Sequence, residues 1–277
     1  MLLNAPPYPI TDDHIHIDPV NGRGIQAAKD FRRAGGTHLF LVSKPSGSFG
    51  IVPRSGDDFR VVFEETLSVA ETIREVGLTV FPVLGVHPAE VTRLSAEMDL
   101  ESVKNIMKGG LDLAAEYVRE GKAIAIKSGR PHYEAPHDIQ AASNEVLFHA
   151  FTLAAGVDCA VQVHAESGPC ADMIGMASRA GLSPGRVVKH YATPDTPLVP
   201  SFLASHPDIP ALCREKRAFT MESDFMDENS RPGAVIGPKS VPKYTNRLYS
   251  SGEITEEDIY RIHVDTPSKV YGVEIRL

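Results

Sequence analysis

The feature that most constrains the fold of this chain is a regular alternation of short apolar segments with longer amphipathic ones. Eight short segments rich in branched apolar residues predict β-strands, at residues 10–18, 37–43, 78–86, 123–128, 158–165, 186–192, 198–205 and 218–224. Prolines interrupt the seventh segment. Apolar residues at helical spacing predict helices at residues 59–76, 100–120, 138–155 and 171–180. Gly109-Gly110 interrupts the second of these helical patterns and predicts a break of the helix into two.

This alternation is typical of βα units and a parallel sheet. Eight such units in 277 residues predict an α/β protein with a (β/α)8 TIM barrel, in one domain over residues 1–277. The stretch 225–249 is rich in Pro, Gly, Arg and Lys, and we interpret it as a long loop. Because it follows the last strand, it is predicted to lie over the mouth of the barrel.

Composition excludes several classes of protein. A net charge of -8 argues against a dedicated duplex-DNA binder, although bound divalent metals would add positive charge to a nuclease. Three widely spaced cysteines predict no disulfide framework and favour a cytoplasmic protein. The N-terminus does not have the pattern of a signal peptide, and we expect no membrane association because no apolar stretch is long enough to span a bilayer.

Four histidines and one aspartate lie in or at the end of predicted strands. His14 and His16 are two residues apart on the first strand, so their side chains point to the same side. His164, His190 and Asp224 end the fifth, sixth and eighth strands, on the face where barrel enzymes keep their active sites. Each of them alone fits an ordinary structural role, but together they predict a site for zinc or a similar divalent ion.

The order of these residues resembles the TatD-type hydrolases of the amidohydrolase superfamily. The resemblance includes the His14-x-His16 pair, the Gly-Val-His-Pro segment at 85–88, the Glu-Ser-Asp segment at 222–224 and the closing segment 259–272. Residues 231–242 are similar to an archaeal-type branch of uncharacterised TatD-related proteins. The resemblance implies a metal-dependent hydrolase that acts on ester bonds, with phosphoesterase or deoxyribonuclease activity.

Lys127 departs from the TatD pattern. TatD enzymes carry a glutamate on the fourth strand that bridges two metals, whereas the matching segment here, 125–130, is Ala-Ile-Lys-Ser-Gly-Arg. Phosphotriesterase-like members of the superfamily use a lysine there, and its carbamate bridges two metals. An ammonium group cannot bind a cation, but a carbamate offers two oxygens. We therefore predict Lys127 as a carboxylated metal ligand. The alternative is a cation that pairs with Glu134, Glu166 or substrate beside a single metal.

Asp224 and His190 are the predicted catalytic residues. Asp224 is expected to accept the proton of a water molecule that the metal makes more acidic. Glu222 is predicted to orient a ligand histidine from behind, with a structural role on the opposite side of its strand as the alternative. Side chains in the mouth loops are predicted to contact substrate: His87, for which bracing the loop beside Pro88 is the alternative, and the cations Arg130, Arg231, Lys239 and Lys243.

The substrate is less constrained than the site. Aromatic residues are only 7% of the chain and Trp is missing, so an extended base-stacking surface is not expected. A small phosphorylated or ester compound or a single-stranded DNA end fits better. One or two divalent ions are expected, zinc first, with manganese, nickel, iron or magnesium as alternatives. A lactonase, amidohydrolase or phosphotriesterase-like enzyme is the alternative function, and a non-catalytic metal-binding barrel is the third. Oligomeric state is left open.

Overall fold

The computed structural model describes residues 8–230 and 235–277, which form two compact units. The first unit consists of the residues up to 41, residues 68–81 and residues 200–277. The second consists of residues 42–67 and 82–199. The expectation of one domain over 1–277 stays a prediction. None of the helices in the described part of the chain is both long enough and apolar enough to cross a bilayer.

Strand β1 (Thr11–His16) is central to the first unit. It pairs in parallel with β2 (His38–Val42) on one side and with the short β9 (Phe225–Met226) on the other. Strands β7 (Val199–Leu203) and β8 (Thr220–Glu222) also pair in parallel. The turn between β8 and β9 is held against β1 by a hydrogen bond of 2.9 Å from Asp224 N to His14 O. The first and last strands of the alternation are therefore neighbours, as closure of a barrel requires.

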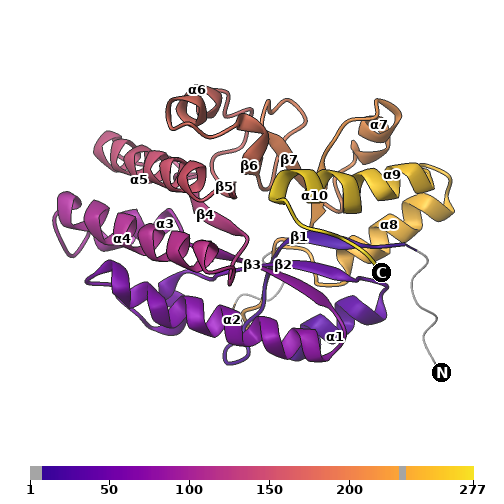
Figure 1. Cartoon of the computed structure of the whole chain (residues 1–277), viewed down its shortest axis with the longest axis horizontal. Coiled ribbons are helices and arrows are strands. Elements are labelled where there is room, and N and C mark those ends of the chain that lie inside the picture. Colours follow the sequence, from indigo (N-terminus) through magenta and orange to yellow (C-terminus); the bar gives the residue numbers. More distant parts are fainter. Residues whose placement is uncertain (1–7, 231–234) are drawn as a thin grey trace. The chain divides into compact units, whose positions relative to one another are not determined.

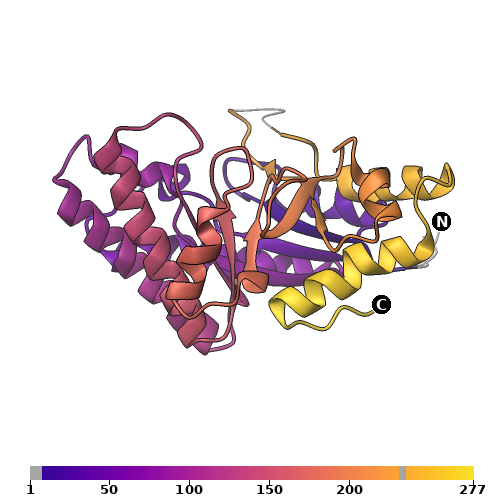
Figure 2. The same ribbon diagram turned by 90° about the horizontal axis from the view of Figure 1, so that it is seen from above.

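Most helices of the first unit come from the C-terminal part of the chain. The helices of this unit are α1 (Ile25–Arg33), α7 (Ile209–Arg214), α8 (Ser240–Ser250), α9 (Glu256–Tyr260), the π-helical turn η4 (Arg261–Asp265) and α10 (Thr266–Tyr271). The last three follow one another as a nearly continuous helix, drawn in yellow in Figure 2. His263 of η4 bonds through its two ring nitrogens to the Thr11 backbone and to Thr245 Oγ1. The terminal helix thereby fixes the start of β1.

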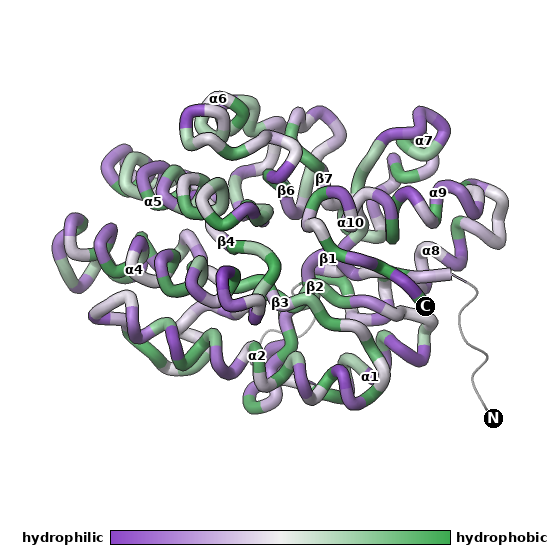
Figure 3. Tube along the Cα trace, in the orientation of Figure 1, coloured by the Kyte–Doolittle hydropathy of each residue, from purple (hydrophilic) through white to green (hydrophobic). Residues whose placement is uncertain are grey.

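The second unit is a run of parallel strands with helices beside it. Strands pair in chain order, β3 (Thr79–Gly85), β4 (Ala125–Gly129), β5 (Ala160–His164) and β6 (Val187–Lys189). The helices are α3 (Ala89–Leu94), α4 (Leu100–Arg119), α5 (His137–Gly156) and α6 (Asp172–Arg179), with 3-10 turns η1 (Ser46–Phe49), η2 (Gly56–Phe59) and η3 (Pro184–Arg186). Helices α4 and α5 lie side by side next to β4 (Figure 1). Both show alternating hydrophobic and hydrophilic bands along their length (Figure 3), as amphipathic helices do.

Strand alternation decides which side chains of β4 and β5 face the helices. Ile126, Val161 and Val163 belong to the apolar core that the helices form with these strands. Because successive side chains point to opposite faces of a strand, Lys127 and His164 point away from that core. The sheet therefore presents its polar residues on the face opposite to the helices.

The predicted strands and helices are confirmed, with two differences. All eight strands and the four helices form within a few residues of their predicted bounds. Helix α4 is unbroken at Gly109-Gly110, and these glycines let Gly56 and Phe59 of η2 pack closely against it. Helix α2 (Arg60–Glu75) and strands β2, β3 and β7 each contribute residues to both units.

The second difference concerns the predicted loop 225–249. A loop throughout this stretch is wrong, because β9 occupies its first two residues and α8 most of its second half. Val241, Thr245 and Leu248 are buried at helical spacing, and Pro242 is tolerated because it lies in the first turn. Residues 231–234 lie outside the described part of the chain. The composition of this segment favours a loop, but burial of the apolar stripe stabilises the helix α8.

Candidate functional site

The first metal group consists of His14, His16 and Asp224, all in the first unit. One possible ligand atom of each residue lies within 4.8 Å of the corresponding atoms of the other two. The Nε2 atoms of His14 and His16 are 3.2 Å apart, and Asp224 Oδ1 is 3.8 Å from His14 Nε2. Both histidines are buried. The structure brings these three residues together, as the sequence predicts.

Local backbone irregularities aim these side chains. The register of β1 against β2 shifts between Asp12 and Ile15, which marks a bulge at the position of His14. Asp224 has a φ of 45°, in the left-handed region that non-glycine residues rarely adopt. Asp224 follows the end of β8 by two residues, and its carboxylate faces His14. Backbone strain of this kind is often concentrated at functional sites.

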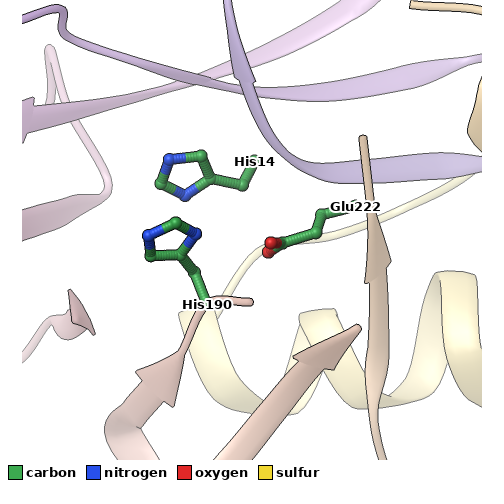
Figure 4. A group of neighbouring side chains, drawn as sticks. All are labelled: His14, His190 and Glu222. Carbon is green, nitrogen blue, oxygen red and sulfur yellow. The ribbon is translucent and has the colours of Figure 1, made fainter. Parts of the chain in front are cut away.

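Two more carboxylates lie beside the first metal group. One of them is Glu222, and ligand atoms of Glu222 and His14, both labelled in Figure 4, lie within 4.8 Å of each other. Asp12 Oδ1 accepts hydrogen bonds from the backbone N–H groups of His14, at 3.3 Å, and Ser223, at 3.0 Å. Burial raises the pKa of Asp12 to about 7. Asp12 thus ties β1 to the turn that carries Asp224.

A second group of predicted metal ligands, Lys127, His164 and His190, lies in the second unit. His164 Nδ1 lies 2.8 Å from His190 Nε2. Burial, followed by the positive charges of His87 and Lys127, lowers the pKa of His164 well below its usual value. The imidazole of His164 is therefore neutral at physiological pH, which is the form that binds a metal.

Lys127 lies in the middle of β4, where only 2% of its surface is exposed. It is paired with Gln162 of β5, two residues before His164, and both side chains point away from the helices. Lys127 therefore lies on the same strand face as the predicted metal ligand His164. Its assignment as a metal ligand stays a prediction.

The predicted substrate contacts lie in different environments. Arg130 is buried, and its guanidinium donates to Glu166, through Nε at 2.8 Å, and to Asp172, through Nη1 at 2.6 Å. His87 packs its ring against His164, with centroids 4.6 Å apart, while its Nδ1 accepts the N–H of Ala89 at 3.2 Å. Both predicted roles of His87, at the site and as a loop brace, therefore have a structural basis.

The remaining predicted contacts are cations in the chain after β9. Lys239 and Lys243 are exposed at the start of α8. Arg231 lies outside the described residues. The assignment of Arg130, Lys239 and Arg231 to substrate binding stays a prediction.

Sequence reasoning missed Asp12 and His132. His132 Nδ1 lies 2.7 Å from His164 Nε2, although His132 is in the loop after β4 and belongs to no periodic segment. Asp12 shares the strand of His14 and His16 at spacing two, a signal that could have found it. The only sequence signal for His132 is its position after the end of a predicted strand, and many loop residues share that position.

Comparison with known proteins places the chain in a family. The model of the TatD related DNase family matches residues 11–272. An uncharacterised protein, MJ1127 of Methanocaldococcus jannaschii, is 34% identical, and the match covers 97% of this chain and 98% of that protein. Both matches span nearly the whole chain, so the relationship includes both units.

Solved structures agree on the fold. The TatD homologue YJJV of Escherichia coli has a TM-score of 0.65 at 16% identity, covering 95% of this chain and 98% of that one. A variant of a phosphotriesterase-like lactonase of Deinococcus radiodurans has a TM-score of 0.59 at 15% identity, with 98% of each chain covered. The predicted fold class, a TIM-barrel-like α/β fold, is confirmed. The chain belongs to the TatD-related family of metal-dependent hydrolases.

Proposed function

We propose that this chain is a metal-dependent phosphoesterase of the deoxyribonuclease type, acting on small phosphorylated compounds or on single-stranded DNA ends. The observation that carries the proposal is the first metal group, in which two imidazoles and a carboxylate offer ligand atoms within 4.8 Å of one another. Its membership of the TatD-related family supports hydrolysis of phosphoesters. The three buried thiols support a cytoplasmic location.

The donor sets of both groups fit divalent ions. The first group supplies two imidazole nitrogens that face each other at 3.2 Å and a carboxylate beside them, a set that suits zinc. The second group supplies the neutral imidazole of His164 and the adjacent His190. Zinc is the proposed ion, and manganese, nickel, iron and magnesium are the alternatives. When bound, such an ion polarises the bond to be hydrolysed and makes the attacking water more acidic.

Asp224 is the proposed general base. Its side chain is 15% exposed, so water can reach it, and its left-handed backbone conformation directs the carboxylate to the histidines of β1. Glu222 is proposed to position His14, since it is buried within 4.8 Å of that residue. His190 is proposed to act through Nε2, the atom that faces His164.

Lys127 is proposed to be carboxylated. Its neutral amine would add to carbon dioxide and release one proton, which forms an N–C bond and leaves an anionic carbamate with two oxygen ligands. The test is the metal content of wild type, Lys127→Ala and Lys127→Glu, purified with and without bicarbonate. We expect Lys127→Ala to lose metal and Lys127→Glu to retain it without bicarbonate. An unchanged metal content in Lys127→Ala would contradict this assignment.

A turnover assay tests the function. The protein, stripped of metal and reloaded with zinc, would be offered single-stranded oligonucleotides, generic phosphate mono- and diesters, and lactones. We expect zinc-dependent hydrolysis of phosphoesters, and a decrease in kcat of about 100-fold or more in Asp224→Asn, as for loss of a general base. Asp208→Asn, an exposed aspartate of the first unit, is the matched control and should keep full activity.

A lactonase is the second candidate, and Lys127 favours it. The lysine stands on the strand where phosphotriesterase-like members of the superfamily have theirs, and the fold is shared with a lactonase. Zinc-dependent turnover of lactones without turnover of phosphoesters would replace the first proposal by this one. No zinc-dependent turnover of any substrate would leave a non-catalytic metal-binding barrel.

A further inference from the structure

His164 has a partner at each of its two ring nitrogens. Its Nδ1 lies 2.8 Å from His190 Nε2, and its Nε2 lies 2.7 Å from His132 Nδ1. The third neighbouring imidazole, His87, packs against the ring of His164 with centroids 4.6 Å apart. Because His87 Nδ1 accepts the N–H of Ala89, that nitrogen is used within its own loop. His132 is thus the residue that contacts Nε2 of His164.

The chemistry of imidazole links these two contacts. A neutral imidazole has one N–H and one lone pair, so the partner of one nitrogen decides what the other can do. If the proton of His164 is on Nε2, it donates to His132 Nδ1, and Nδ1 of His164 has a lone pair for a cation. If the proton is on Nδ1, it points at His190 Nε2, and the pair can no longer share one ion.

The loop that carries His132 is anchored at both ends. On one side, the Arg130 backbone N–H donates to His164 O at 2.8 Å, and the Arg130 side chain binds Glu166 and Asp172. On the other side, Tyr133 Oη donates to Thr92 Oγ1 at 2.7 Å. The His132 ring also packs edge-on against Tyr133, with centroids 5.3 Å apart. His132 is therefore held at His164 although its own side chain is exposed.

We infer that His132 is a positioning residue, whose Nδ1 accepts the Nε2–H of His164 and so reserves Nδ1 of His164 for a metal ion shared with His190. The inference rests on the proposed function where it assigns an ion to these nitrogens. The tautomer itself is a property of the metal-free chain. The ion pairs of Arg130 with Glu166 and Asp172 hold the start of this loop.

The test uses His132→Ala and His132→Asn in the full chain. Alanine removes the acceptor, whereas the Oδ1 of asparagine can occupy nearly the same place as Nδ1 of histidine. His137→Ala is the matched control, because His137 is an exposed histidine of the same loop region at the start of α5. Zinc affinity is measured by competition with a chelating dye. We expect about 10- to 100-fold weaker zinc binding in His132→Ala, with affinity near that of wild type in His132→Asn and His137→Ala.

A second readout follows the tautomer directly. Two-bond proton–nitrogen NMR spectra at mildly alkaline pH distinguish the two neutral forms of His164, and a His164→Asn variant assigns its signals. We expect the Nε2–H form in wild type and His132→Asn, and a mixture of both forms in His132→Ala. This measurement needs no metal, so it still decides the role of His132 if wild type binds no zinc and the proposed function fails.

Three results would overturn the inference. One is an Nδ1–H tautomer of His164 in the wild-type protein. Another is a His132→Ala variant that keeps both the tautomer and the zinc affinity of wild type. A loss of zinc affinity that His132→Asn does not restore would also contradict it and would indicate that His132 binds the ion itself.

Discussion

Asp227 holds the loop that follows the first metal group, and removing its carboxylate should cost substantial stability. The side chain is 1% exposed. Its Oδ2 accepts the backbone N–H groups of Asp18, at 3.0 Å, and Gly24, at 2.8 Å, while its Oδ1 accepts that of Arg23 at 2.7 Å. The loop begins two residues after His16. The carboxylate therefore satisfies three backbone donors of one loop at once.

The magnitude follows from these three hydrogen bonds. A hydrogen bond to a charged group contributes about 1.5–3 kcal/mol, and a buried donor left without its partner costs about 1–3 kcal/mol. Because the loop is near the surface and water can replace part of the loss, we expect Asp227→Ala to lower the free energy of unfolding by about 3–5 kcal/mol. Asp227→Asn keeps an oxygen for two of the three donors, so we expect it to lower the free energy of unfolding by only about 1–2 kcal/mol.

Equilibrium unfolding in urea, followed by circular dichroism, measures the difference. Glu228→Ala is the matched control, because this neighbouring carboxylate accepts a bond from Ser230 rather than from the loop backbone. Gly22→Ala gives an independent check, since a Cβ at Gly22 would collide with the Asp227 carboxylate and push it off the loop. A loss of less than about 1 kcal/mol in Asp227→Ala, or a larger loss in Asp227→Asn, would refute the reasoning.

Three further predictions concern the core, the pH dependence and the metal. Phe151→Ala, in the fully buried core of the second unit, should lower stability by about 3–5 kcal/mol in urea unfolding, and Phe148→Ala, 37% exposed, by much less. Burial lowers the pKa of His263 to about 4, so its neutral form stabilises the fold above pH 6.5 and this contribution disappears as the pH falls toward 4. The stability difference between wild type and His263→Gln should change by about 3 kcal/mol across that window, and a flat difference would contradict the assignment. Chelation should abolish turnover and lower the melting temperature, with recovery of both on adding zinc; melting curves that coincide with and without chelator would speak against a bound metal.

Much of the fold could be predicted because it depends on local periodicity. The side-chain period of two along β1 placed His14 and His16 on one face before any partner strand was known. The strand-and-helix alternation predicted the eight strands and the fold class, and the order of short motifs indicated the family that the comparisons confirm. Helix α8 was missed because proline, glycine and lysine masked a short apolar stripe.

Only the tertiary structure decided how the site residues meet. The bulge in β1 and the left-handed backbone of Asp224 aim three ligand atoms at one another, and neither leaves a periodic trace in the sequence. His132 reaches His164 through a loop whose course depends on the contacts of Arg130 and Tyr133 with other segments. The sequence by itself determined the strands, their faces and the ligand types, because backbone sterics and burial act over neighbouring residues. Pair distances, tautomers and the partners of buried charges depend on register and loop conformation, which long-range packing alone establishes.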